Sequence, residues 1–201
     1  MFDIDDLAYL FKNGKVESKD IYKQDVSKHQ QVAKKIIAHN SNFSETLFTS
    51  WVSNMFLRCI YYCSGKDNEK LLRFKKNHFY DSNINLQNLI NLYNEYRDIS
   101  IKFIDFLDFV HTEDNDTITI KLCLSCSSEE ENEPYFFYYT LELRKQNDYN
   151  KEQGSKSNYT SNCPNCGAPT NITTFGICAH CQEMVSIYDN VWKIIKIELD
   201  K

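Results

Sequence analysis

The sequence predicts an α+β protein in which helices pack on one face of a curved antiparallel sheet and a small cysteine-rich module follows the sheet. Two changes of pattern along the 201 residues indicate this order. Apolar residues recur at helical spacing in the first half of the chain and alternate with polar residues over residues 99–144. Two Cys-x-x-Cys pairs come after that region.

The N-terminal part of the chain is predicted to be helical. Residues 3–12 form a short acidic segment that ends at an Asn-Gly break, and residues 18–39 show an amphipathic pattern with lysines opposite the apolar positions. We interpret the second segment as a helix that packs on the main domain. The alternative is an arm that binds a partner.

The strongest helix is predicted to begin directly after Asn42. Asn42 is a candidate N-cap, and Glu45 stands three residues later, in position to bond back to it. A long apolar stripe follows and ends at Ser64 and Gly65. Two shorter helices are predicted over residues 68–79 and 86–98.

The pattern changes to that of β-strands at residue 99. Strands are predicted over residues 99–110, 117–126 and 134–144, with acidic loops between them. Ile101 and Phe103 are out of phase with Ile104 and Phe106, which predicts a bulge that bends the first strand. Helices followed by a meander of long strands are typical of an α+β domain.

Four cysteines near the C-terminus predict a metal site. Cys163 and Cys166 are separated from Cys178 and Cys181 by eleven residues. Each pair lets two thiolates bind one ion from a tight turn, and two pairs supply the four ligands of a tetrahedral zinc site. Because such a site has no open position, we expect one structural Zn²⁺ ion rather than a catalytic one. The alternatives are a disulfide, a redox pair or chance, and His180 is a further candidate ligand.

The other four cysteines give weaker signals. Cys59 and Cys63 lie one helical turn apart, whereas Cys123 and Cys126 lie three residues apart on a predicted strand. An offset of three sends two strand side chains to opposite faces, and the alternation places Cys126 inward and Cys123 outward. We expect Cys59, Cys63 and Cys126 to be small core residues rather than a metal or redox site.

Acid–base candidates do not form a recognisable arrangement in the sequence. They are Asp105, Asp108 and His111, near the end of the first strand, together with His78. Neither a cofactor motif nor a nucleophile arrangement accompanies them, so the sequence favours a protein that is not an enzyme. A set of aromatic residues is expected to be core, with the lining of a cavity for an apolar ligand as the alternative: Phe56, Tyr61, Tyr93, Phe103, Phe137 and Tyr139.

Charge and hydropathy exclude several classes of function. A net charge of −5 argues against nucleic-acid binding, which favours a basic face. The acidic N-terminus does not resemble a secretory signal, and no apolar run approaches the length that spans a bilayer. We therefore expect a cytoplasmic protein with no integral membrane segment, in which the cysteines are reduced.

Several short segments of the chain carry a resemblance to known proteins. They are Asn42, Phe43, Ser44, Glu45, Phe48, Trp51, residues 114–120, residues 163–169 and Trp192. With these residues, the chain from about residue 35 to its end resembles bacterial proteins that join a Tim-forty-four-like domain, a branch of the nuclear-transport-factor-like cone fold, to a C-terminal zinc ribbon. The resemblance implies a cone-like curved antiparallel sheet with N-terminal helices packed on one face. It also implies a relation to the mitochondrial import-motor scaffold, whose domain of this type lies against the inner membrane and organises partners.

This organisation divides the chain into four parts. They are an N-terminal helical arm (1–40), a cone-like α+β domain (41–145), a linker (146–161) and a zinc ribbon (162–201). We expect a non-enzymatic adaptor or scaffold that binds another protein. The alternatives are a carrier with an apolar small molecule or lipid in the cone pocket, a membrane-docked scaffold and a cone-fold enzyme.

Overall fold

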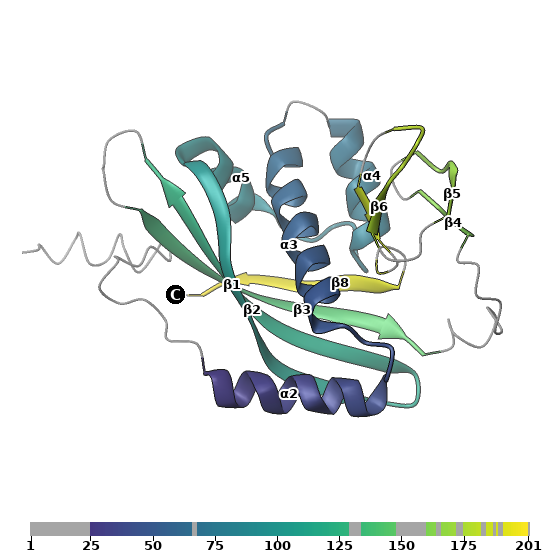
Figure 1. Cartoon of the computed structure of the whole chain (residues 1–201). Helices are drawn as coiled ribbons and strands as arrows, with labels where there is room; N and C mark the ends of the chain where they lie inside the picture. The colour runs from purple at the N-terminus through teal and green to yellow at the C-terminus, as the bar shows by residue number, and fades with distance from the viewer. Residues whose placement is uncertain are drawn as a thin grey trace, which may run out of the picture.

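A four-stranded antiparallel sheet and the helices around it make up most of the structure, a computed structural model (Figure 1). The α+β class predicted from the sequence is confirmed. The predicted helix at residues 3–12, the start of the helix predicted over residues 18–39 and most of the linker lie outside the described residues. The structure describes residues 25–65, 68–128, 134–147, 160–163, 166–171, 175–181, 184–186, 188 and 191–200.

Four helices precede the sheet in the described part of the chain. They are α2 (Val26–His39), α3 (Glu45–Tyr62), α4 (Asn68–His78) and α5 (Gln87–Glu95). The helices from α3 onward follow the predicted order, with α5 ending earlier than predicted because the extended backbone of the first strand begins at Arg97.

Ser44, and not the predicted Asn42, caps α3. The Ser44 Oγ accepts a hydrogen bond from the Leu47 N–H at 3.4 Å, and Ser44 itself has the extended backbone of an N-cap. Glu45 is therefore the first residue of the helix and cannot serve as the third residue of a capping box. Its carboxylate instead contacts His29 of α2, with Oε1 2.9 Å from Nε2.

The sheet has the strand order β1-β2-β3-β8 and is open, with β1 and β8 at its edges. Strands β1 (Arg97–His111), β2 (Asn115–Ser127) and β3 (Tyr135–Gln146) form the predicted meander. The register of β1 against β2 shifts between Ile101 and Phe103 and again between Phe106 and Asp108. The predicted bulge in the first strand is thus confirmed.

The last strand, β8 (Trp192–Leu199), pairs antiparallel with β3 and belongs to the main sheet. The sequence pattern predicts these residues as part of the C-terminal zinc ribbon, because they follow the cysteines in the chain. In the structure Trp192 and Ile194 are buried in the main core. The Tyr80 N–H also donates to the Ile194 carbonyl at 2.9 Å, which ties the segment after α4 to this edge.

The core lies between the helices and one face of the sheet. Helix α3 crosses this face and α2 runs along β1 (Figure 1). Phe48 is fully buried and its ring lies 5.5–5.9 Å from those of Trp51, Phe106 and Trp192. Such aromatic packing joins helix and sheet through large apolar contacts.

The cysteines outside the C-terminal pairs are all buried. Cys59, Cys63 and Cys126 lie in the main core, as predicted. Cys123 lies outside this core, on the other face of β2 as predicted, but it is also buried, with an exposed fraction of 1%. It stands between Phe103 and Tyr138 on the neighbouring strands, and burial raises the pKa of its thiol.

Candidate metal centre

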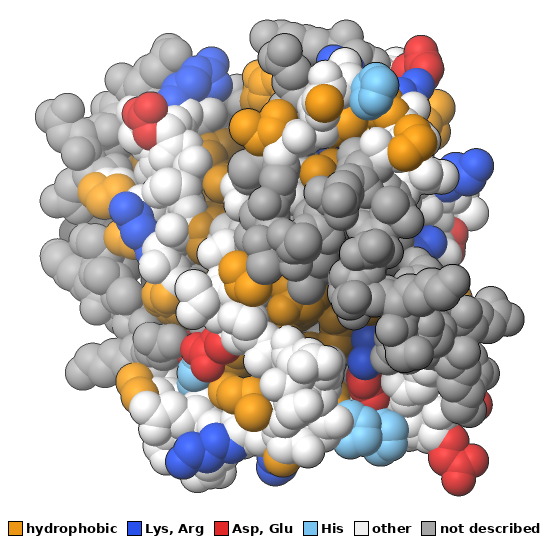
Figure 2. Space-filling model, turned by 45° about the vertical axis from the view of Figure 1, so that its right-hand side comes forward, with side chains coloured by type: hydrophobic (Ala, Val, Ile, Leu, Met, Phe, Trp, Pro, Cys, Tyr) orange, Lys and Arg blue, Asp and Glu red, His pale blue; other side chains and the backbone are white. Residues whose placement is uncertain are grey.

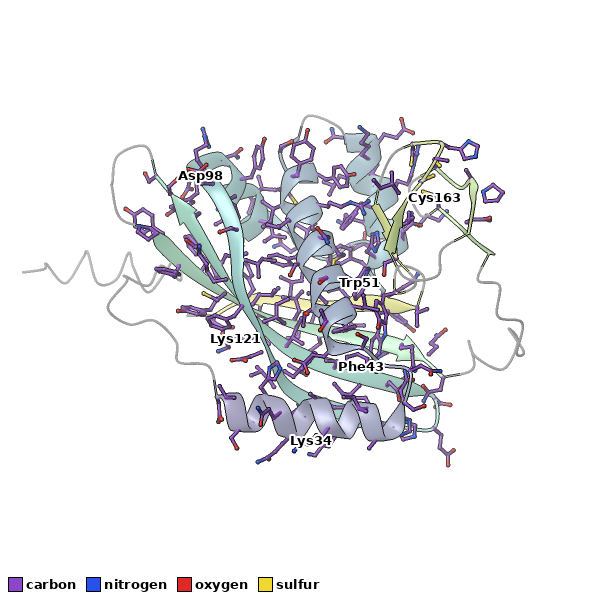
Figure 3. The ribbon with its side chains drawn as sticks, viewed as in Figure 1. Lys34, Phe43, Trp51, Asp98, Lys121 and Cys163 are labelled. Carbon is purple, nitrogen blue, oxygen red and sulfur yellow. The ribbon has the colours of Figure 1, made fainter. Side chains whose placement is uncertain are left out.

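Short strands hold the four C-terminal cysteines. Strands β4 (Thr160–Asn162) and β5 (Pro169–Asn171) pair with each other, as do β6 (Phe175–Ile177) and β7 (Met184–Ser186). Figure 3 shows sulfur atoms gathered near Cys163 in this part of the structure, beside the helices.

The first cysteine pair lies in a tight turn. The Cys163 N–H donates to the Ala168 carbonyl and the Gly167 N–H donates to the Cys163 carbonyl, both at 2.8 Å. Gly167 has a φ of 75°, a left-handed conformation that glycine adopts without steric cost. The turn therefore folds back under the position that a metal ion would occupy.

The four sulfur atoms form a compact cluster, called the cysteine cluster from here on. The Sγ atoms of Cys163 and Cys181 are 3.6 Å apart, those of Cys166 and Cys178 are 3.7 Å apart, and all four lie within 4.8 Å of one another. Bonds of about 2.3 Å to one tetrahedral zinc ion would set the sulfurs about 3.8 Å apart. The cluster can therefore hold a metal ion, whereas a disulfide needs sulfurs only about 2.05 Å apart.

The backbone around Cys178 favours the thiolate form of this residue. Cys163 and Cys178 are buried with Val185, while Cys166 is exposed. Hydrogen bonds from the backbone at Cys181 and His180 lower the pKa of the Cys178 thiol to about 6. His180 itself is exposed and is not part of the cluster. Since thiolates are the metal-binding form of cysteine, these backbone groups favour cation binding by Cys178.

A second group of metal-ligating side chains was not predicted. His39, His111 and Asp116 present ligand atoms within 4.8 Å of one another, and we call them the histidine–aspartate cluster. His111 Nδ1 lies 2.7 Å from Asp116 Oδ1, and His39 Nε2 lies 3.7 Å from the same oxygen. The other oxygen of Asp116 pairs with Lys145 Nζ at 2.8 Å. Figure 2 shows histidine side chains at the surface, some beside acidic and Lys or Arg side chains.

One signal in the sequence could have found part of this cluster. His111 and Asp116 are paired across the β1–β2 hairpin, and Asp116 is paired with Lys145 on β3. The predicted hairpin between residues 110 and 117 already places His111 and Asp116 near each other. His39 comes from the end of α2, and nothing in the sequence indicates where that helix ends relative to the hairpin.

The four acid–base candidates do not form one site. Asp108 is exposed and accepts a hydrogen bond from the Phe109 N–H, and His111 belongs to the histidine–aspartate cluster. His78 is buried elsewhere, where burial, assisted by the charges of Arg58 and Lys193, lowers its pKa to about 3. It is thus a neutral core histidine.

Asp105 instead lies beside His29, which the sequence did not single out. The Phe106 N–H donates to His29 Nδ1 at 3.2 Å, which leaves Nε2 to donate to Glu45. The buried Asp105 Oδ1 lies 3.2 Å from Nδ1, and within the described residues no hydrogen bond reaches the Asp105 carboxyl. A hollow of about 320 Å³ borders His29 and Glu45, and the side chains of Thr49, Ser50, Ser53 and Lys102 also line it.

An open groove lies where α3, α5 and the start of β1 meet, and we call it the tyrosine groove. It has a volume of about 560 Å³, and its walls include Tyr61, Tyr93 and Tyr96. Of the predicted aromatic set, Tyr61 and Tyr93 thus line a cavity, while Phe56, Phe137 and Tyr139 are plain core. Asp98 at its rim, labelled in Figure 3, has a φ of 51°.

Comparisons with known proteins add no relative, since the chain matches no family model, no curated protein and no solved structure. The resemblance to Tim-forty-four-like proteins and the cone shape that it implies therefore stay predictions. Among the helices of the described residues, none combines the length and apolar character that crossing a bilayer requires.

Proposed function

We propose that the protein is a non-enzymatic adaptor that binds another protein, and that the cysteine cluster holds one structural zinc ion. Four thiols so close together fill every position of a tetrahedral zinc, which leaves none for a substrate. The role of the metal is then to hold together strands of only three residues each, β4, β5, β6 and β7, because so small a module has little core of its own. Only Val185 and the cysteines make up their described core.

The observation that carries the adaptor proposal is the tyrosine groove. Tyr61 is 59% exposed at its edge, and Leu57, Ile60 and Ile99 supply apolar surface. Tyrosine and arginine are enriched in protein–protein interfaces, where they anchor binding energy, and Arg97 also borders this groove. We propose that an apolar or aromatic side chain of a partner protein packs against Tyr61 and Tyr93, whose rings contact each other with centroids 6.4 Å apart.

Backbone strain at the rim supports this assignment. Asp98 has a Cβ and yet adopts a left-handed backbone, which costs on the order of 1 kcal/mol. Its carboxylate is held by the Ser127 hydroxyl, which donates to Oδ2 at 2.7 Å. Strained residues of this kind concentrate at binding sites, where the surrounding structure holds them in place.

Affinity purification with matched variants tests the adaptor proposal. The wild-type chain, Tyr61→Ala and Leu72→Ala would each be purified from the native cell. Leu72→Ala is the control, because Leu72 is 66% exposed on α4 and does not line the groove. We expect a partner in near-equal amount with the wild type and with Leu72→Ala, and its loss with Tyr61→Ala. Equal recovery with all three proteins would contradict the assignment of the groove.

The volume of the groove favours one second candidate, a carrier of an apolar small molecule. About 560 Å³ falls within the range of roughly 300–1,000 Å³ that is typical of ligand pockets. Native mass spectrometry of the purified chain separates the two functions. A small molecule that co-purifies with the wild type and not with Tyr61→Ala, in the absence of a protein partner, would support the carrier.

A further inference from the structure

We propose that the histidine–aspartate cluster binds a divalent transition-metal ion, Zn²⁺ in the first place, as a second metal site independent of the cysteine cluster. Two imidazoles and one carboxylate are a ligand set typical of zinc and of other divalent transition metals in proteins. The side chains come from three elements, His39 from the end of α2, His111 from β1 and Asp116 from β2. This inference does not depend on the adaptor proposal.

The distances between the ligand atoms fit one ion after small side-chain movements. Bonds of about 2.1 Å to zinc set neighbouring ligands about 3.4 Å apart in a tetrahedron and about 3.0 Å apart in an octahedron. The observed separations of 2.7 Å and 3.7 Å from Asp116 Oδ1 lie on either side of these values. The rings of His39 and His111 are neighbours, with centroids 3.7 Å apart, and they would move apart as each turns a nitrogen toward the ion.

The carboxylate ligand is already held in orientation. Asp116 is buried, and Lys145 binds its Oδ2, which leaves Oδ1 toward the two histidines. A hydrogen-bonded second oxygen is the usual arrangement of a carboxylate that ligates a metal, because it fixes the direction of the free one. Lys145 would thus be a positioning residue for the site.

Further features of the histidine–aspartate cluster favour a cation. His39 stands in the last turn of α2, where the carbonyl end of the helix dipole favours a cation. Glu113 and Asp114 lie in the exposed turn that joins β1 to β2. Both histidines are about 40% exposed, so an ion can enter from solvent. With three protein ligands and a nearby lysine, we expect weaker binding than at the four thiolates.

The ion would connect elements that are far apart in the sequence. It would join the end of α2 to the β1–β2 hairpin, at an edge of the sheet. Three protein ligands leave at least one coordination position for water, unlike the closed cysteine cluster. The site would therefore be exchangeable, and removal of its metal would leave the fold intact.

Metal titration of the full chain tests the proposal. The protein would be purified with zinc in the cysteine cluster, freed of weakly bound metal with a mild chelator, and titrated with Zn²⁺ by calorimetry and with Co²⁺ by absorption. Cobalt bound by thiolates absorbs strongly through charge transfer from sulfur, whereas cobalt bound by nitrogen and oxygen does not. His39→Gln and His111→Gln change exposed residues of the cluster, and His180→Gln is the matched control near the cysteines.

We expect the wild type and His180→Gln to bind one ion beyond that of the cysteine cluster, without a sulfur charge-transfer band. His39→Gln and His111→Gln should lower the affinity for this second ion by at least about tenfold and leave the circular dichroism spectrum unchanged. The absence of a second ion in the wild type would overturn the proposal. So would a second ion that all three variants bind equally, because it would then lie elsewhere on the chain.

Discussion

The cysteine cluster and the histidine–aspartate cluster both gather metal-ligating side chains, but they do so in different ways. The four cysteines stand within nineteen consecutive residues, 163–181, and short turns bring them together. His39, His111 and Asp116 come from a helix and two strands and meet only when α2 packs along β1. The first cluster is thus a property of a local motif, and the second is a property of the tertiary fold.

The two clusters also differ in what supports them. The described core around the cysteines contains Val185 and little else, so a metal ion would supply most of the stability there. The histidine–aspartate cluster lies on the edge of a large core and keeps its geometry through the sheet register and the Lys145 pair. We therefore expect loss of metal to unfold the first region and not the second.

Replacing a buried cysteine is the most direct way to break this comparison. Cys178→Ser changes a fully buried side chain of the cysteine cluster, and we expect loss of the proposed zinc ion and of the order in residues 160–163, 166–171, 175–181 and 184–186. Structural zinc contributes on the order of 10 kcal/mol to the folding of small modules, so this is the largest effect predicted. Zinc content and hydrogen exchange measure it, and β1, β2 and β3 should keep their protection.

The matched control for this variant is His180→Ala, which changes an exposed neighbour outside the cluster. It should retain zinc and protection. If Cys178→Ser retained both as well, the cysteine cluster would not depend on metal, and the contrast between the two regions would fail.

Asp116→Asn removes the negative charge from the histidine–aspartate cluster and leaves a side chain of almost the same size and shape. Asp116 and Lys145 side chains are 3% and 8% exposed, so the variant leaves a buried ammonium without its carboxylate. Loss of one partner of a buried pair costs about 3 kcal/mol. Urea unfolding of zinc-loaded protein should show this loss as a lower midpoint at an unchanged slope.

Glu142→Gln is the control for an exposed ion pair on the same sheet. Its carboxylate lies 3.5 Å from Lys196, and both side chains are partly exposed, so we expect a change below about 1 kcal/mol. Equal effects of the two variants would mean that the pair of Asp116 and Lys145 is solvated and does not hold the cluster in place.

His78 is a useful contrast to the histidines of the histidine–aspartate cluster, because it is buried without a carboxylate partner in the described structure. Its folded-state pKa of about 3 lies below the ordinary value of 6.5, mainly because burial disfavours the charged ring. The unfolded chain therefore binds a proton that the folded chain does not. The stabilising contribution is complete above about pH 6.5 and is lost as the pH falls toward 3, by at most roughly 1.4 kcal/mol per pH unit.

The measurement is the free energy of unfolding between pH 7.5 and 5.5 for wild type and His78→Gln. The variant lacks the titrating ring, so its stability should fall less steeply in this window. Parallel curves for the two proteins would show that His78 accepts a proton in the folded state, and that its burial does not exclude charge.

Much of the fold could be predicted because its signals are local. Alternation along β1, β2 and β3 predicted the meander, and the phase change between Phe103 and Ile104 predicted the bulge. The spacing of Cys163, Cys166, Cys178 and Cys181 predicted the cysteine cluster.

The remaining features depend on contacts between distant residues. Trp192 and Ile194 have the pattern of a strand, but nothing in that pattern shows that its partner is β3, which precedes the cysteines. The meeting of His39 with Asp116 and of His29 with Asp105 depends on how α2 lies on β1. Sequence periodicity states which face of a helix is buried, but it does not state what that face contacts.

The smallest effect is predicted for the N-cap of α3, which is a feature of local sequence as the cysteine cluster is. Ser44→Ala removes the acceptor of the Leu47 N–H and should cost about 1 kcal/mol or less, because the bond is long at 3.4 Å. Asn42→Ala should change stability by less than about 0.5 kcal/mol, since exposed Asn42 lies outside the cap. Urea unfolding of both variants measures the difference. A larger loss of stability with Asn42→Ala than with Ser44→Ala would support the capping box that the sequence predicted, and would mean that α3 begins earlier than Glu45.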